Sequence, residues 1–356
     1  MLKVYSNRDL DYVDKVLMPK ISRTFYLTLQ SLPEDLRRDC LVAYAFCRAI
    51  DNQEDSRLKM KEKIDLMNET VSTFSNGDVK SARKLQRRLG AIGQKKEGYL
   101  QLMKNYSRVV GASQVLGKNV TSIIAECGRQ MIDGLSNPEI QRIETLDDHH
   151  RYCHYAAGVV GYFITKDLVV RGYISSKLAK KIMPSTHDNN PFSGVNPAHD
   201  FAVALQLANN IRDYHDDYKN SIFRWPSDLL ANNGLNYEEL ANPRLSGRKL
   251  EKAVCVLTEQ IEDAQKFFPA AAKWIDRIPY EARGKPKSAL KGIKKSWGSA
   301  LALSVATLTK INSSEFFTDP TSRKLSKEEL YEVVGAVSKT VNSEGKIESL
   351  VDLLLR

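Results

Sequence analysis

Residues 40–55 read Cys-Leu-Val-Ala-Tyr-Ala-Phe-Cys-Arg-Ala-Ile-Asp-Asn-Gln-Glu-Asp. Up to position 50 this stretch is apolar on almost every side of a helix, which is typical of a helix that is buried all round. The exceptions are spaced four, three and four residues apart, so they share one face. They are Tyr44, Arg48, Asp51 and Asp55. The stretch therefore predicts a buried helix with one polar line that ends in carboxylates.

A second segment, residues 201–217, repeats this arrangement. After the apolar run 201–205, polar residues follow at spacings of three, four and four, with Arg212 beside them. They are Gln206, Asn209, Asp213 and Asp217. One acidic row at a helix end is usually a solvated cap, because charged side chains are mostly exposed. Two rows on buried helices favour a metal site instead, because a buried carboxylate persists when it is paired or binds a metal.

The types of side chain indicate the chemistry of this site. Oxygen donors without His or Cys favour Mg²⁺, which takes one or two carboxylates together with substrate phosphate. The expected metal ligands are Asp51, Glu54, Asp55, Asp213 and Asp217. Arg23, Arg48 and Arg212 would donate charge-assisted hydrogen bonds to phosphate oxygens. The ring faces of Tyr44 and Tyr152 would stabilise a cation that apolar walls protect from water.

Residues 1–356 are predicted to form one all-α domain with a central apolar cavity. The chain has no Pro/Gly-rich linker, and helical periodicity recurs without strand-turn-strand patterns. We expect helices over residues 9–30, 35–56, 59–75, 83–108, 112–136, 145–174, 196–219, 247–278, 286–312, 326–341 and 346–355. Breaks between them are expected at residues 76–78, 184–196 and 279–286.

Four motifs occur along the chain in a fixed order. They are Ser22-Arg23-Thr24-Phe25, Tyr44 to Asp55, Tyr152-Cys-His-Tyr-Ala-Ala-Gly158-Val-Val-Gly161, and Gln206 to Asp217 followed by Trp225-Pro226. In order and spacing they resemble the squalene/phytoene synthase family. The Tyr-Cys-His-Tyr form of the third motif resembles squalene synthases more than phytoene synthases. Ser56 stands where many squalene synthases have another aspartate, a departure that bears on rate or metal preference rather than on metal binding.

The resemblance implies the isoprenoid synthase fold of head-to-head prenyltransferases and a two-step reaction. Two molecules of farnesyl diphosphate would condense to presqualene diphosphate, which NADPH would reduce to squalene. The tyrosine that matches Tyr152 is implicated in the family in proton removal during cyclopropane closure. Family positions that contact the nucleotide phosphates match Arg23, Arg48, Arg212, Lys291, Lys294 and Lys295. Family positions that contact the substrate match Ser22, Arg23, Phe25, Arg48, Tyr152, Gln206, Asn209 and Arg212.

Several alternatives stay open. A related enzyme could stop at presqualene diphosphate or make dehydrosqualene, phytoene or botryococcene, and a non-catalytic scaffold could keep the fold. Lys291 to Lys295 could be a solvated helix turn, although the absence of a G-x-G-x-x-G motif leaves no Rossmann site for the nucleotide. Gly158 and Gly161 would either leave room for a substrate chain or allow close helix packing. His150 and His154 could share a metal, but without a third ligand we expect ordinary helix positions.

The net charge and the two ends of the chain indicate which partners the protein could bind and where it is located. The net charge of +10 is compatible with nucleic acid, an anionic membrane surface or anionic substrates. No nucleic-acid motif accompanies the scattered basic residues, so we expect diphosphate binding and peripheral membrane contact. The five cysteines lack metal or disulfide spacing, which predicts reduced cysteines in a cytoplasmic protein. No signal peptide or apolar run long enough to span a bilayer is seen, and we expect a monomer that is either naturally unanchored or shortened.

Overall fold

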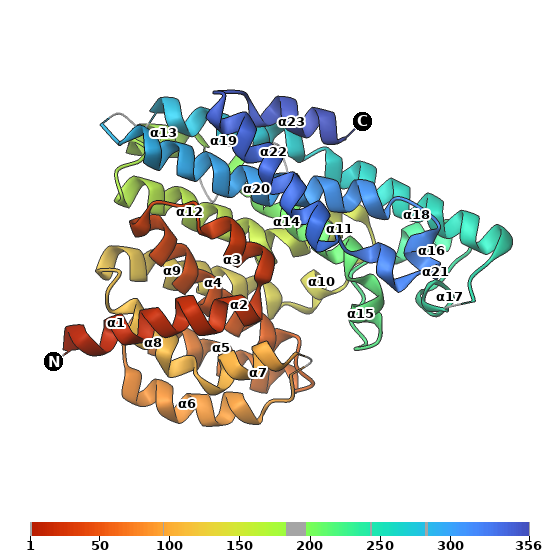
Figure 1. The fold of residues 1–356 in the computed structure, drawn as a ribbon. Coiled ribbons are helices and arrows are strands. Elements are labelled where there is room, and N and C mark those ends of the chain that lie inside the picture. The colour runs from red at the N-terminus through yellow and green to blue at the C-terminus, as the bar shows by residue number, and fades with distance from the viewer. Residues whose placement is uncertain (1, 95, 183–196, 243, 282–283, 356) are drawn as a thin grey trace.

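The computed structural model describes residues 2–94, 96–182, 197–242, 244–281 and 284–355. Within these residues every regular element is a helix (Figure 1), which confirms the all-α class. The first part of the chain forms α1 (Leu2–Tyr12), η1 (Val13–Leu17), α2 (Met18–Ile21), α3 (Arg23–Leu29), α4 (Glu34–Glu54), α5 (Met60–Ser75), α6 (Val79–Ala91), α7 (Glu97–Lys104), α8 (Tyr106–Ser113) and α9 (Lys118–Leu135).

The rest of the described chain is equally helical. Its middle part forms α10 (Pro138–Gln141), α11 (Leu146–Cys153), η2 (His154–Gly158), α12 (Val159–Val170), α13 (Ser176–Ile182), α14 (Pro197–Arg212), α15 (Tyr214–Tyr218), α16 (Ser227–Asn232) and α17 (Tyr237–Ala241). Its last part forms α18 (Gly247–Gln265), α19 (Phe268–Glu281), α20 (Lys287–Ile311), α21 (Glu315–Thr318), η3 (Pro320–Arg323), α22 (Lys327–Asn342) and α23 (Ile347–Leu354). No helix in these described ranges is both long and apolar enough to cross a membrane.

The helices that carry the two acidic rows pack through shared neighbours at the centre of the molecule. In Figure 1 the helices α1 to α8 gather in the lower half and α18 to α23 in the upper half. Between them α12 packs against α4, α9 and α14, and α14 packs in turn against α19 and α20. This arrangement surrounds α4 and α14 with other helices, which explains why residues 40–50 and 201–208 are apolar apart from their polar lines.

Helix α4 forms where the sequence predicts it. Pro33 directly precedes it, and Glu34 and Asp35 occupy its first turn, where negative charge is favoured by the helix dipole. Phe46 is fully buried, with its ring centre 4.2 Å from that of Phe74 on α5. The helix ends at Glu54, so the acidic row stands at its carboxyl end.

Close packing explains the two glycines of the third motif. A Cβ atom on Gly161 would lie 2.2 Å from the backbone oxygen of Ala198, and one on Gly158 would lie 2.5 Å from Cδ2 of His199. Both contacts are with α14, and real Cβ atoms essentially never come this close. Of the two alternatives for these glycines, the structure therefore supports close helix packing.

Several predicted boundaries are wrong. The expected helix 83–108 is three helices, α6, α7 and α8, because Ile92 is extended and Asn105 leaves helical geometry. The expected helix 112–136 begins at Lys118, because Gly117 has a φ of +87°. The expected helices 9–30 and 247–278 are interrupted at Ser22 and at residues 266–267.

The predicted breaks have different outcomes. The break at 76–78 is confirmed, because α5 ends at Ser75 and α6 starts at Val79. Helix α19 continues to Glu281, so the break expected at 279–286 comes later than predicted. The break at 184–196 lies outside the described residues.

Candidate functional site

The polar line predicted on α4 is present. Tyr44, Arg48, Asp51 and Asp55 are partly exposed, whereas the other residues from 40 to 50 are buried. The Arg48 guanidinium lies 3.4 Å from Asp51 (Nη1 to Oδ2) and 5.8 Å from the centre of the Tyr44 ring. Solvent therefore reaches this buried helix along the line that carries the charged groups.

The motif at 22–25 surrounds the start of α3. The Phe25 amide donates a hydrogen bond to the Ser22 hydroxyl at 3.3 Å, which satisfies one of the unpaired donors at a helix start. This turn places the Phe25 ring 5.1 Å from that of Tyr44. Arg23 is exposed at the first position of the helix. Ser22 thus contributes by starting the helix that puts Phe25 against the α4 row.

The second polar line, on α14, is also present. Gln206, Asn209 and Arg212 are partly exposed on a helix whose other residues from 201 to 211 are buried, and Asp213, directly after its end, is partly exposed as well. Arg212 donates two hydrogen bonds of 2.7 Å to the carboxylate of Asp213. Gln206 donates to Asn210 Oδ1 at 2.9 Å, so its amide is held within its own helix. Asp217, one turn further on, is partly exposed on α15.

The first turn of α7 lies beside both rows. The Arg48 guanidinium is 5.3 Å from the ring centre of Tyr99, and the Tyr99 side chain also helps to raise the pKa of Arg212 against the opposing effect of burial. Lys96 helps to lower the pKa of Asp213. Tyr99, which lies beside Arg48 of the first row, and Lys96, which directly precedes α7, are therefore site residues that the sequence did not single out.

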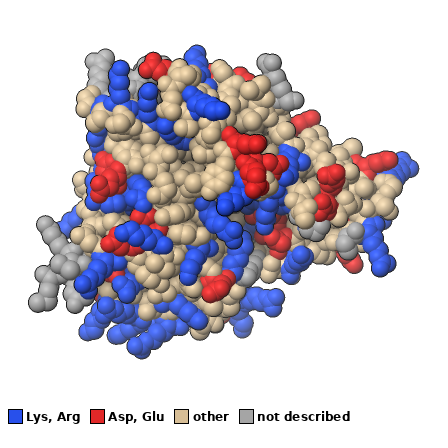
Figure 2. All heavy atoms as spheres, viewed as in Figure 1, with Lys and Arg blue, Asp and Glu red and all other residues tan. Residues whose placement is uncertain are grey.

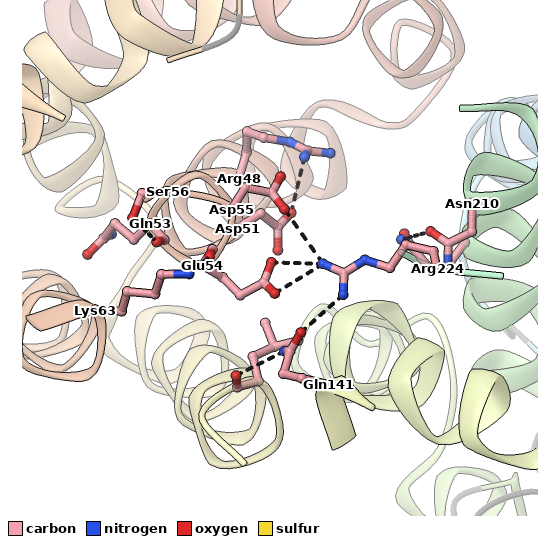
Figure 3. A network of polar contacts seen from close by, with 12 residues as sticks. Arg48, Asp51, Gln53, Glu54, Asp55, Ser56, Lys63, Gln141, Asn210 and Arg224 are labelled. Carbon is pink, nitrogen blue, oxygen red and sulfur yellow. Dashed lines mark hydrogen bonds and ion pairs between the residues drawn. The ribbon is translucent and has the colours of Figure 1, made fainter. Parts of the chain in front are cut away.

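Arg224 is the most connected group of the site, and the sequence analysis missed it (Figure 3). Its Nη2 lies 3.0 and 3.2 Å from the two carboxylate oxygens of Glu54, and its Nη1 donates to Gln141 Oε1 at 3.0 Å. Asp55 Oδ1 is 3.6 Å from Nη2. The guanidinium carbon lies 4.0 Å from the centre of the Tyr152 ring. One feature of the sequence could have indicated Arg224: it directly precedes Trp225-Pro226, the pair that follows the fourth motif.

Burial sets the electrostatics of the first row. Desolvation raises the pKa of Asp51 to about 6 and that of Glu54 to about 7, against the opposing charges of Arg48 and Arg224. Burial also raises the pKa of Tyr152, and Arg224 opposes that shift. In the second row burial would raise the pKa of Asp213, but the hydrogen bonds and charge of Arg212 outweigh it, so the pKa is lowered. The first row therefore favours the arrival of further positive charge.

The donor set of the two rows suits Mg²⁺. Among the residues that the structure describes, no three His, Cys, Asp or Glu side chains stand close enough to hold one ion. Mg²⁺ does not require such a group, because it takes one or two carboxylates and completes its octahedron with phosphate and water. The side chains of Asp51, Asp55 and Asp213 are 24%, 32% and 28% exposed, so their oxygens are accessible to an ion.

Comparison with known proteins decides the family. The family model described as squalene/phytoene synthase matches residues 18–329. The chain belongs to the squalene/phytoene synthase family. Its Botryococcus braunii relative "Squalene synthase BSS" is 27% identical over 264 residues, covering 72% of this chain and 51% of the relative. "Squalene synthase 1" of Arabidopsis thaliana is 28% identical over 262 residues, covering 71% and 57%. The chain thus spans about half the length of the curated relatives it matches.

A solved structure confirms the family's fold. The complex of TcSQS with the ligand E5700 superposes with a TM-score of 0.76 and 20% identity, covering 98% of this chain and 91% of that one. At this identity the likeness concerns the fold alone. The all-α isoprenoid synthase fold expected from the motifs is therefore confirmed.

The lysines expected at the nucleotide site of this family member differ in their surroundings. Lys294 is mostly buried, with its Nζ 2.7 Å from Asp276 Oδ1 and 2.8 Å from the Gly345 carbonyl oxygen. Asp276 also accepts hydrogen bonds from the backbone amides that begin α23. Lys294 therefore helps to hold α23. Lys291 and Lys295 are partly exposed on α20, and the nucleotide role of all three stays a prediction.

His150, just before the third motif, and His154, within it, have separate partners. His150 pairs with Asp263, whereas His154 lies 3.1 Å from His199 (Nδ1 to Nε2). Burial, together with the neighbouring His199, lowers the pKa of His154 to about 3. This agrees with the expectation that they are ordinary helix positions rather than joint ligands of one metal.

Proposed function

We propose that this protein is a squalene synthase. It condenses two molecules of farnesyl diphosphate to presqualene diphosphate in a Mg²⁺-dependent step and then reduces that product to squalene with NADPH. Family membership supports head-to-head prenyl transfer, and squalene synthases among the relatives support this product. The observation that carries the proposal is that two buried helices each bring carboxylates to one line and pair one of them with an arginine within 3.4 Å.

The two rows bind the diphosphate of the substrate. Asp51, Asp55, Asp213 and Asp217 hold Mg²⁺, which neutralises the leaving diphosphate when bound. Arg48 and Arg212 exchange their carboxylate partners for phosphate oxygens, with Arg23 at the exposed edge. Because each arginine is already beside its carboxylate, phosphate binding requires only a change of partner.

The apolar side chains behind the rows protect the cation. Residues 42–46 and 201–207 are largely buried and apolar, so water is kept from the reacting carbon and electrostatic interactions are strengthened. Tyr44 presents its ring, and Tyr152 takes part in proton removal during ring closure. Phe25, Gln206 and Asn209 complete the substrate-binding surface.

The second step requires NADPH. Its phosphates are bound by arginines of the rows together with Lys291, Lys295 and the neighbouring Lys294, since the chain has no glycine-rich dinucleotide loop. These assignments rest on the family resemblance. The requirement for NADPH distinguishes squalene from products that form without a reductant.

A basic surface supports peripheral contact with an anionic membrane. Figure 2 shows Lys and Arg gathered along the lower edge of the molecule, over α6. The exposed basic residues of that helix are Lys80, Arg83, Lys84, Arg87 and Arg88. Each such residue near an anionic surface contributes about 1 kcal/mol. The protein then acts as a cytoplasmic monomer that delivers an apolar product to the membrane.

Product identification tests this proposal. Purified protein is incubated with farnesyl diphosphate and Mg²⁺, with and without NADPH, beside an Asp213→Asn control. Squalene formed only with NADPH supports it. Presqualene diphosphate or dehydrosqualene as end product in both reactions would overturn the squalene assignment, as would botryococcene formed with NADPH or phytoene formed in a parallel incubation with geranylgeranyl diphosphate. No turnover of either substrate would favour a non-catalytic scaffold.

A further inference from the structure

The contacts of Arg224 assign a role to Glu54 that differs from the metal ligand expected from its motif. We propose that Glu54 and Arg224 form a clamp that positions Tyr152, and that Glu54 is the counter-ion of Arg224 rather than a Mg²⁺ ligand. The inference deepens the proposed function, on which the role of Tyr152 rests.

The carboxylate of Glu54 is fully engaged. Both of its oxygens lie within 3.2 Å of Arg224 Nη2, and its side chain is 10% exposed, against 24% for Asp51 and 32% for Asp55. A Mg²⁺ ion binds at about 2.0–2.1 Å from its oxygen ligands, so an ion on Glu54 would meet the guanidinium or displace it into a buried position without a partner. Asp51 and Asp55 also have a guanidinium nearby, but at the longer distances of 3.4 Å to Arg48 and 3.6 Å to Arg224 and with more exposed side chains, so an ion reaches them more easily.

The guanidinium is fixed from three directions. Glu54 comes from the end of α4, Gln141 from the end of α10, and Tyr152 from α11. The next residue, Trp225, is fully buried, and its Nε1 donates to the Asn210 backbone oxygen at 3.3 Å. The backbone beside Arg224 is therefore anchored on α14, and the guanidinium carbon lies over the Tyr152 ring, 4.0 Å from its centre.

This contact decides how Tyr152 acts. A guanidinium over one ring face occupies the position in which a carbocation would be attracted and repels a second cation from it. Tyr152 therefore acts through its hydroxyl, with its ring orientation fixed by Arg224. Tyr44 is the better candidate for cation stabilisation, because Arg48 is 5.8 Å from its ring centre, close to the outer limit of about 6 Å for such contacts.

Binding of Mg²⁺ with inorganic pyrophosphate, measured by calorimetry, separates a counter-ion from a ligand without any turnover. We expect Asp51→Asn, which removes a ligand, to weaken this binding by about tenfold more than Glu54→Gln, whose carboxylate lies outside the ion's oxygen shell. Equal weakening by both substitutions would show that Glu54 is a ligand and overturn the clamp.

Steady-state kinetics test the positioning of Tyr152. We expect Glu54→Gln and Arg224→Gln to lower kcat by about 10- to 100-fold with little change in KM for farnesyl diphosphate, and Arg224→Lys to restore part of it. In a Tyr152→Phe background, Glu54→Gln should cause no further loss, because the clamp acts through that hydroxyl. If Glu54→Gln lowers kcat by the same factor in the Tyr152→Phe background as in the wild type, the clamp does not act through that hydroxyl. If the wild type consumes no farnesyl diphosphate, the proposed function fails, while the pyrophosphate experiment still decides the role of Glu54.

A paired substitution covers the case in which a single variant does not fold. Glu54→Leu with Arg224→Met removes both charges and keeps apolar bulk, which is often neutral for a buried ion pair. Retained binding of Mg²⁺ and pyrophosphate by this double variant supports the counter-ion role. Its loss in a folded double variant would overturn it.

Discussion

Replacing Gly161 by alanine tests whether α12 and α14 pack as closely as the structure shows. The added Cβ would lie 2.2 Å from the Ala198 carbonyl oxygen and 2.7 Å from its carbon. These are backbone atoms, so no side chain can rotate away and the two helices must separate. Overpacking costs about 1–3 kcal/mol, against about 1 kcal/mol gained because alanine is the better helix former. Because the contact is between the backbones of two helices, we expect an overpacking cost near 3 kcal/mol and therefore a net loss of stability of about 2 kcal/mol.

Gly335 provides the matched control. It lies inside α22 and a Cβ there would meet nothing within 4 Å, so Gly335→Ala should stabilise the protein by about 0.5–1 kcal/mol. Denaturant unfolding of both variants beside the wild type shows directly whether each substitution raises or lowers the free energy of unfolding. Turnover should also fall in Gly161→Ala alone, because α14 carries Arg212 and leads into Asp213. A Gly161→Ala protein as stable as the wild type would refute the close contact and reopen the alternative that this glycine leaves room for substrate.

Three further substitutions address separate parts of the molecule. Asp213→Asn should abolish turnover of farnesyl diphosphate while far-ultraviolet circular dichroism is unchanged; substantial activity at saturating Mg²⁺ would contradict the two-row site. Burial and the Asp39 charge raise the pKa of Asp167 from 3.8 to about 9, so its contribution to stability is present at acidic pH and lost as pH rises through that value. Asp167→Asn should reduce the dependence of the free energy of unfolding on pH, measured by denaturant unfolding at acidic and alkaline pH. An unchanged pH dependence would exclude Asp167 as its source. Lys294→Ala should lower the unfolding midpoint, because it leaves Asp276 without its cation, whereas Lys295→Ala should lower NADPH-dependent turnover instead; the reverse pattern would exchange their roles.

The parts of the fold that could be predicted are those with a local cause. Helix α4 was predicted to within a residue or two at each end, because its apolar composition and its first-turn acids lie in the segment itself. The three helices between Val79 and Ser113 were not separated, because the apolar period continues through each piece and only the backbone at Ile92 and Asn105 shows the breaks. Periodicity reveals which side of a segment is buried but not where the chain turns.

The same distinction holds for the site. Each polar line could be predicted because spacing along one helix fixes which side chains share a face. Arg224 could not, because its partner Glu54 is 170 positions away and only packing brings the two together. Lys294 is the converse case: the family motif suggested a ligand contact, whereas its neighbours in space include Asp276 and the start of α23. Local spacing therefore predicts candidate sets, and tertiary contacts decide which members have other roles.

The energies of the ion pairs indicate which of them change partner when substrate binds. The side chains of the pairs Arg48–Asp51 and Arg212–Asp213 are all between 24% and 28% exposed, so solvent screens these charges more than those of a buried pair. Arg224 and Glu54 are 8% and 10% exposed, and separating a buried pair costs about 3–5 kcal/mol because a charge is left without a partner. We therefore expect that, if diphosphate and Mg²⁺ bind as proposed, they separate the first two pairs more readily than the third. On the same argument the pair of Arg224 and Glu54 should stay closed during that exchange, so that Tyr152 keeps its orientation.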